Sequence, residues 1–239
     1  MGPMVQNACA IGPFLFRAGE MKTLSIETPT HGRVLVVDAS EAPARGTIVG
    51  FHGYGQSADT ILEELRRIPG AAAWRLVSVQ ALNRFYTRND ASVVASWMTR
   101  QDREAAIADN VEYVNRAVDA AVGADAGPLV YLGFSQGASM AARAAVHGKR
   151  RASGLVLLGG DIPADVKTDT GSRIATLPVL VGIGSGDTWY QKLVDADLQF
   201  LRDRGVSPNV VRFAGGHEFT DEFRSAVGAW IVHFAESRY

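Results

Sequence analysis

Short runs of apolar, often β-branched residues alternate along the chain with segments whose apolar residues recur at helical spacing. This alternation indicates a mostly parallel sheet whose strands are joined by crossover helices. The near-continuous apolar run at 128–134 is typical of a strand that is buried on both faces. The segments that we predict to be strands are 24–28, 33–39, 46–53, 75–81, 128–134, 154–160, 177–184 and 209–215.

The segments between these runs predict helices. One begins near Ser57 and places Ile61, Leu62, Leu65 and Ile68 on one face. The others are predicted at 102–122, 136–147 and 191–204, with a last helix whose apolar stripe runs from Phe219 to Phe234. About eight strands, mostly parallel, therefore form a three-layer α/β domain over 21–239. Residues 1–20 are expected to be an N-terminal extension or an edge strand.

Composition excludes several classes of protein. The 239 residues are 47% hydrophobic and 21% charged, as in an ordinary globular protein. Lys plus Arg is 24 and Asp plus Glu is 25, so no excess of positive charge favours nucleic-acid binding. The sequence has no stretch of about 18 apolar residues, so no membrane insertion is predicted. The single cysteine, Cys9, and the absence of a positively charged start to a signal peptide favour the cytoplasm.

A serine nucleophile is predicted at Ser135. The segment 133–137 reads Gly-Phe-Ser-Gln-Gly and fits the pattern G-x-S-x-G. A predicted strand runs directly into it and a predicted helix starts directly after it, which is the context that a nucleophile elbow requires. The amino end of that helix offers free N–H groups to a developing oxyanion. The alternative is a serine that caps an ordinary turn between a strand and a helix.

Chain order then selects the base and the acid. His217 is the one histidine that follows Ser135 and lies in a loop after a predicted strand, where parallel sheets place their chemistry. Asp187 directly follows the strand at 177–184, so its carboxylate is expected to orient the imidazole. Asp161, which follows the preceding strand, is the competing acid.

The loop after the third predicted strand supplies the other half of an oxyanion hole. The expected donors are the backbone N–H groups of Gln136 and Tyr54, with Gly53 as the fallback. The irregular stretch 82–100 should overhang the site as a rim or small flap, or else pack as a satellite of the core. Its predicted substrate-contacting residues, together with Gly53, are Phe85, Tyr86, Trp97 and Met98. The sixteen residues at 161–176 leave no room for a large cap domain.

These motifs occur in one order, as HGYGQS, GFSQG, GGDIP, GSGD and GGHE. Together they resemble the phospholipase/carboxylesterase family of α/β-hydrolases, which includes acyl-protein thioesterases. The resemblance covers nearly the whole chain beyond residue 20. It implies a cofactor-free hydrolase with catalytic roles for Ser135, Asp187 and His217. Gly137-Ala138, where members often carry Gly-Gly, and GGDIP, where acyl-protein thioesterases carry SGxLP, favour small esters over acylated proteins.

We therefore expect a monomeric or homodimeric serine esterase that cleaves small or medium acyl esters through an acyl-enzyme. A thioesterase or lysophospholipase with the same triad is the alternative, followed by a cofactor-free perhydrolase and a non-catalytic binding protein of the same fold. No metal is expected, because no H-x-H, HExxH or clustered cysteines occur, and the family resemblance implies that no cofactor is needed. The expected partner is a small-molecule ester.

Overall fold

The computed structural model describes residues 21–40, 42–88, 91–123, 127–169 and 173–236. Residues 21–30 carry no helix or strand, and the elements all lie in the compact unit that begins at His31. The strands are β1 (Arg33–Val37), β2 (Thr47–Phe51), β3 (Arg75–Gln80), β4 (Asn83–Tyr86), β5 (Val93–Ser96), β6 (Leu129–Phe134), β7 (Gly154–Leu158), β8 (Val179–Gly184) and β9 (Asn209–Phe213). The helices are α1 (Ala58–Arg66), α2 (Arg103–Val122), α3 (Gln136–His147), α4 (Ala164–Thr168), α5 (Gln191–Asp203) and α6 (Asp221–Glu236), with short 3-10 turns at Ala71–Ala73 and Arg173–Thr176.

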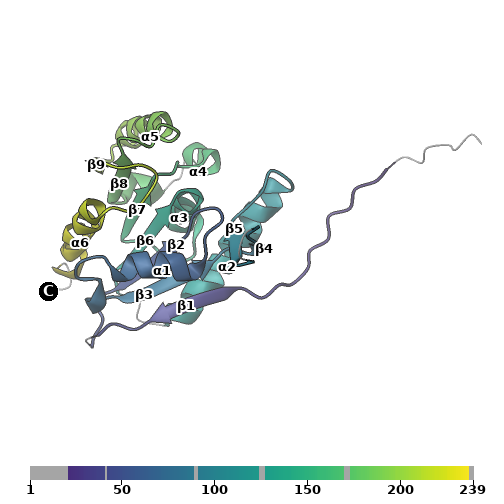
Figure 1. The fold of residues 1–239 in the computed structure, drawn as a ribbon, viewed down its shortest axis with the longest axis horizontal. Coiled ribbons are helices and arrows are strands. Elements are labelled where there is room, and N and C mark those ends of the chain that lie inside the picture. The colour runs from purple at the N-terminus through teal and green to yellow at the C-terminus, as the bar shows by residue number, and fades with distance from the viewer. Residues whose placement is uncertain (1–20, 41, 89–90, 124–126, 170–172, 237–239) are drawn as a thin grey trace, which may run out of the picture. The chain divides into compact units, whose positions relative to one another are not determined.

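Seven strands form one sheet in the order β1-β3-β2-β6-β7-β8-β9 (Figure 1). β1 pairs antiparallel with β3, and every other neighbouring pair in this sheet is parallel. The mostly parallel sheet with helices on both faces confirms the predicted fold class. The carboxyl ends of β2, β6, β7, β8 and β9 consequently meet at one edge, where the candidate catalytic residues follow.

Two apolar clusters give the molecule its three layers. One cluster combines one face of the sheet with α2, α3, α4 and α5, and the other combines the opposite face with α1 and α6. Successive residues of β6 alternate between them: Tyr131 belongs to the first cluster and Leu132 to the second. This period of two, with every residue of β6 buried, explains why the sequence shows a continuous apolar run there.

The predicted strand at 24–28 is not present in the structure. Residues 21–30 have no strand, and Leu24 and Ile26 are largely exposed. Alternating apolar residues form a strand only where a neighbouring strand accepts their hydrogen bonds, and no described strand pairs with this segment. The main sheet therefore has seven strands among the described residues instead of about eight.

The stretch 82–100, expected to be irregular, contains a two-stranded antiparallel hairpin of β4 and β5. Val94 and Ala95 are buried, whereas Tyr86 stays largely exposed. The connection between β7 and β8 holds only α4 and a short 3-10 turn, so no cap domain is inserted at that point of the described chain.

Candidate active site

Ser135 lies in the sharp turn between β6 and α3. Its φ of 55° and ψ of −122° fall in a region that non-glycine residues rarely adopt. The turn fits because its neighbours lack side chains. A Cβ on Gly137 would stand 2.1 Å from the carbonyl oxygen of Phe51, and one on Gly160 would stand 2.3 Å from that of Ser135. The strained backbone and the close approach of bare chains are the physical marks of a nucleophile elbow.

His217 and Asp187 are joined by a short hydrogen bond. The Nδ1 atom of His217 lies 2.6 Å from Oδ2 of Asp187, on the loops that follow β9 and β8. The Asp187 side chain is buried, and its Oδ1 accepts a 3.3 Å hydrogen bond from the backbone N–H of Tyr190. An ionised carboxylate in this position accepts a hydrogen bond from the Nδ1–H of the imidazole and leaves Nε2 free to act as a base.

The competing acid, Asp161, is engaged elsewhere. Its Oδ1 and its carbonyl oxygen each accept a 3.1 Å hydrogen bond from the hydroxyl of Ser139 on α3. Of the two aspartates that the sequence proposes, Asp187 is the one hydrogen-bonded to His217.

Aromatic rings hold the imidazole of His217. The ring of Tyr190 stacks on it with centroids 5.1 Å apart and an interplanar angle of 9°. The ring of Phe134, which directly precedes Ser135, lies 4.8 Å away. On a third side, a Cβ on Gly159 would stand 3.1 Å from Nδ1 of His217 and 3.3 Å from Oδ2 of Asp187. The serine turn and His217 are thus neighbours, and no sequence pattern indicates the contact of Tyr190 with this ring.

The loop after β2 carries the expected oxyanion donors. The N–H of Gly53 already donates a 2.8 Å hydrogen bond to Oε1 of Gln56, whereas the N–H of Tyr54 has no partner among the described residues. A Cβ on Gly53 would lie 3.2 Å from Cβ of Ser135, so this loop borders the nucleophile turn. Tyr54 is consequently a better candidate donor than Gly53.

His52, which chain order excludes as the base, anchors this loop. Its ring is fully buried; Nε2 accepts a 3.0 Å hydrogen bond from the N–H of Ala81, so Nδ1 carries the proton and donates to the carbonyl oxygen of Gly53 at 2.7 Å. Burial holds the pKa of His52 below its ordinary value, against the smaller opposing effect of the Gly53 hydrogen bond. Its position directly after a strand is the one sequence signal for this role.

The side chain of Gln136 ties the second donor to the hairpin. Its Oε1 accepts a 2.9 Å hydrogen bond from the N–H of Trp97, and its Nε2 donates to the carbonyl oxygen of Met98 at 3.1 Å. The indole N–H of Trp97 in turn donates to the carbonyl oxygen of His52 at 2.9 Å. Both proposed oxyanion donors are therefore held by one hydrogen-bond network.

The four predicted rim residues separate into two pairs. Trp97 is fully buried and Met98 nearly so, and Trp97 packs in the core beside the ring of Phe51. Phe85 is half-buried against the ring of Tyr54, with centroids 5.5 Å apart, and Tyr86 is largely exposed. Contact of Phe85 and Tyr86 with a substrate stays a prediction.

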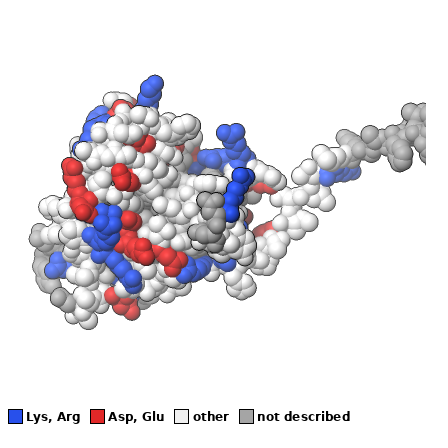
Figure 2. Space-filling view, in the orientation of Figure 1, with Lys and Arg blue, Asp and Glu red and all other residues white. Residues whose placement is uncertain are grey.

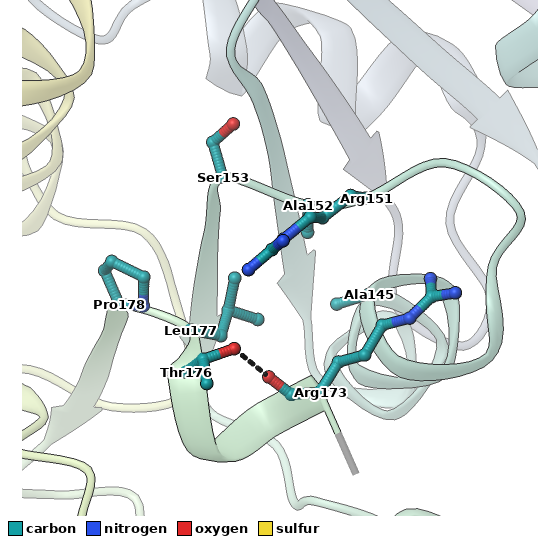
Figure 3. A pocket seen from close by; sticks show the side chains of 8 residues that line it. All are labelled: Ala145, Arg151, Ala152, Ser153, Arg173, Thr176, Leu177 and Pro178. Carbon is teal, nitrogen blue, oxygen red and sulfur yellow. Dashed lines mark hydrogen bonds between the residues drawn. The ribbon is translucent and has the colours of Figure 1, made fainter. Parts of the chain in front are cut away.

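A cavity of about 350 Å³ lies away from these residues (Figure 3). Its lining residues Ser153 and Pro178 directly precede β7 and β8, so it opens at the amino ends of the strands. The guanidinium groups of Arg151 and Arg173 point in different directions in this view, and Thr176 donates a hydrogen bond to the carbonyl oxygen of Arg173. It contains no pair of nucleophile and base, and we do not consider it the reactive site.

The described residues contain neither a metal-binding cluster nor a helix suited to span a membrane. No group of three or more His, Cys, Asp or Glu side chains is arranged to hold a metal ion. None of the helices in that part of the chain is both long enough and apolar enough to cross a bilayer.

Comparison with known proteins agrees with the fold. The chain is 30% identical over 105 residues to the protein MhqD of Bacillus subtilis (strain 168); the match spans 44% of this chain and 52%, about half, of that relative. The structure of Zea mays acyl-protein thioesterase 2 superimposes with a TM-score of 0.68 at 20% identity, over 86% of this chain and 100% of that one. The structure of a Bacillus cereus carboxylesterase superimposes with a TM-score of 0.64 at 18% identity, over 85% of this chain and 94% of that one.

The sequence profile of the phospholipase/carboxylesterase family matches residues 33–199, a span that contains both the serine turn and Asp187. This span is more than half of the chain. The protein therefore belongs to the phospholipase/carboxylesterase family of α/β hydrolases.

Proposed function

We propose that the protein is a serine hydrolase that cleaves carboxylic esters of small or medium acyl groups through an acyl-enzyme intermediate. The observation that carries this proposal is the 2.6 Å hydrogen bond between His217 and Asp187, beside a serine held at the strained turn before α3. Family membership supports a hydrolase, and the hydrogen bonds that connect Gln136 through Trp97 to the loop after β2 support catalysis by backbone hydrogen-bond donors.

In the first half-reaction, Oγ of Ser135 attacks the carbonyl carbon of the ester while Nε2 of His217 takes the serine proton. The carboxylate of Asp187 stabilises the imidazolium that forms. The tetrahedral intermediate places its oxyanion against the N–H groups of Tyr54 and Gln136. When the intermediate collapses, the bond to the alcohol breaks, and His217 gives its proton to the departing oxygen.

In the second half-reaction, water takes the place of the alcohol. His217 removes a proton from the water as it attacks the acyl carbon, and the same two N–H groups bind the second oxyanion. Collapse then breaks the bond to Oγ of Ser135, which recovers its proton from His217, and the carboxylic acid leaves.

The proposal is tested by comparing Ser135→Ala with Ser139→Ala on one activated ester. Ser139 is a matched control, because it lies one turn further along α3 and hydrogen-bonds to Asp161. We expect Ser135→Ala to lower kcat by at least about 10⁴ and to abolish covalent labelling by a fluorophosphonate, whereas Ser139→Ala keeps both. Melting curves verify that each variant is folded. Near-normal turnover by folded Ser135→Ala would end the proposal.

A matched pair of an oxygen ester and a thioester with the same acyl group separates the esterase from a thioesterase. We expect the larger kcat/KM for the oxygen ester of a short acyl group. A strong preference for the thioester, lost in Ser135→Ala, would keep the triad and replace the substrate class.

A further inference from the structure

A cavity of about 300 Å³ opens beside His217. It lies on the α1 and α6 side of the sheet, with walls that include Thr60 and Glu64 from α1 and Phe219 and Arg224 from the segment after His217. Figure 2 shows acidic and basic side chains side by side where α1 and α6 meet on this face. The cavity is therefore polar at its walls, although it adjoins the apolar core.

Of the proposed catalytic residues, His217 lines this cavity, and two other lining residues are neighbours of the site. Phe134, which lines it, directly precedes Ser135. Gln56, which also lines it, accepts the 2.8 Å hydrogen bond from the N–H of Gly53 in the oxyanion loop. Because His217 also lines the cavity, one part of an ester can occupy the cavity while the carbonyl carbon of that ester lies at Ser135.

The chemistry of the reaction decides which part of the ester lies here. The protonated base gives its proton to the oxygen of the departing alcohol, so that alcohol must lie against His217. We propose that this cavity is the leaving-group subsite and that it binds an alcohol carrying further hydroxyl groups, of the glycerol type. This inference rests on the proposed function and adds the substrate class to it.

The walls offer both kinds of hydrogen-bonding group. Oε2 of Glu64 accepts two hydrogen bonds from Arg224, at 2.7 and 2.5 Å, but Oε1 lies 3.8 Å from the nearest nitrogen of Arg67. That second oxygen keeps capacity as an acceptor. Nε2 of Gln56 has no hydrogen bond to any described residue and is a donor, and the hydroxyl of Thr60 is either. Hydroxyl groups satisfy such a mixture because each one donates and accepts.

Other leaving groups fit these walls less well. A long alkyl chain would cover Oε1 of Glu64 without offering it a hydrogen bond, which is costly because that oxygen has no other close partner. An anionic alcohol meets no surplus of positive charge, because Arg224 and Arg67 both bind the carboxylate of Asp221, at 2.6 and 3.1 Å. A neutral alcohol with hydroxyl groups remains, and the rings of Phe134 and Phe219, 5.3 Å apart, offer an apolar surface to its carbon atoms.

The experiment compares 1-monobutyrin with propyl butyrate, which share the acyl group and differ in the two extra hydroxyls of the alcohol. Release of butyric acid is followed in a pH-stat, and each kcat/KM is divided by the alkaline hydrolysis rate of that ester to remove intrinsic reactivity. We expect the wild-type enzyme to prefer monobutyrin by about tenfold, the effect of one or two hydrogen bonds.

Two variants locate the preference. Thr60→Val removes a hydroxyl at nearly constant volume, and Glu64→Gln removes the charge while keeping an amide oxygen; each should reduce the preference by about fivefold. Glu112→Gln on α2 is the charge control, since its carboxylate binds Lys149 and Arg116 on the other side of the sheet. Thr60→Val keeps the inference testable if Glu64→Gln fails to fold beside the buried Arg224.

The outcomes separate this inference from the proposed function. If neither ester is cleaved, or if folded Ser135→Ala still cleaves them, the proposed function fails. If both esters are cleaved with equal normalised rates, or if Thr60→Val leaves the preference unchanged, the leaving-group subsite is overturned while the hydrolase stands. A shift of acyl-length preference in Thr60→Val would also overturn it, because the cavity would then hold the acyl group.

Discussion

Two aspartates show that the local environment of a residue determines which one can serve as the proposed acid. Asp161 and Asp187 each follow a buried strand of the sheet, and from the sequence either is able to serve as the acid. Only the carboxylate of Asp187 lies within hydrogen-bond distance of His217. Asp161 instead accepts a hydrogen bond from Ser139 on α3. Their mutations should therefore have very different consequences.

We predict that Asp187→Asn lowers kcat on an activated ester by about 10⁴, because the amide favours the wrong imidazole tautomer and no longer stabilises its charged form. Asp161→Asn should cost less than about tenfold, since it alters only a loop contact with α3. Both kcat values are measured on variants whose melting curves show a fold. A crippled Asp161→Asn beside an active Asp187→Asn would reverse the assignment of the acid.

His52 carries a prediction about pH. Burial lowers its pKa in the folded protein, so below the unfolded value of about 6.5 the unfolded chain binds more protons than the folded one. The free energy of unfolding should consequently fall as pH drops below about 6.5, by up to about 1.4 kcal/mol per pH unit from this group. The contribution of His52 is isolated by measuring the free energy of urea unfolding for the wild type and His52→Gln between pH 7.5 and 5.5. Identical slopes in the two proteins would contradict the prediction.

The residues that the sequence reveals are those with a local signature. Ser135 stands in a five-residue motif, and His217 follows from chain order and loop position. The side chain of Gln136 has no such signature, because its partners Trp97 and Met98 are about forty residues away in the chain. For His52 the position after a strand is the one signal, and only the folded chain brings Trp97 between His52 and Gln136.

At the scale of elements, the turn after β7 limits the space beside His217. Gly159 has a φ of +54°, and a Cβ there would press against both His217 and Asp187. Gly205, after α5, has a comparable φ of +79° with nothing within 4 Å of its added Cβ. The two glycines share the backbone constraint and differ only in whether the site is within reach.

We predict that Gly159→Ala and Gly205→Ala each lower the free energy of unfolding by about 1–2 kcal/mol, the cost of a left-handed backbone for alanine. Gly159→Ala alone should reduce kcat, by about tenfold or more, because displacement of the imidazole misplaces the base. Denaturant unfolding and kcat on one ester measure the two effects. Equal kcat values in the two variants would show that the Gly159 turn does not constrain His217.

Strands that are buried on both faces could be predicted from the sequence. The prediction failed where strand formation depends on pairing with a neighbouring strand. The continuous apolar runs of β6, β7 and β8 are strands in the structure, and α3 has the predicted bounds of 136–147. The alternating pattern around Leu24 and Ile26 looks like a strand, yet no described partner pairs with it. The hairpin of β4 and β5 was missed because each strand has only four residues and β4 has none that is fully buried.

At the scale of the molecule, one sheet carries two helical layers, and ion pairs join α1 to α6 within one of them. Arg224 of α6 binds Glu64 of α1, and Arg67, just after α1, binds Asp221 of α6. These contacts link the helix after the Gly53–Tyr54 loop to the helix after the His217 loop. No sequence pattern indicates this pairing, because its partners lie more than 150 positions apart.

The last prediction concerns the extent of the domain. In the described part of the sheet, β1 and β9 each have a neighbour on one side only, and residues 21–30 add no strand. If 21–239 is the domain, a chain that starts at Met21 should keep its kcat/KM and show one calorimetric transition. It should melt within about 2 °C of the full chain, because a change of less than about 0.5 kcal/mol in the free energy of unfolding shifts Tm by no more than that. The alternative, an edge strand formed by residues 1–20, predicts a fall in Tm of several degrees, because an outer strand would lose the hydrogen bonds that it makes with its neighbour. Calorimetry of both chains at one protein concentration distinguishes the two, and a second transition would show instead that 21–239 is not one cooperative domain.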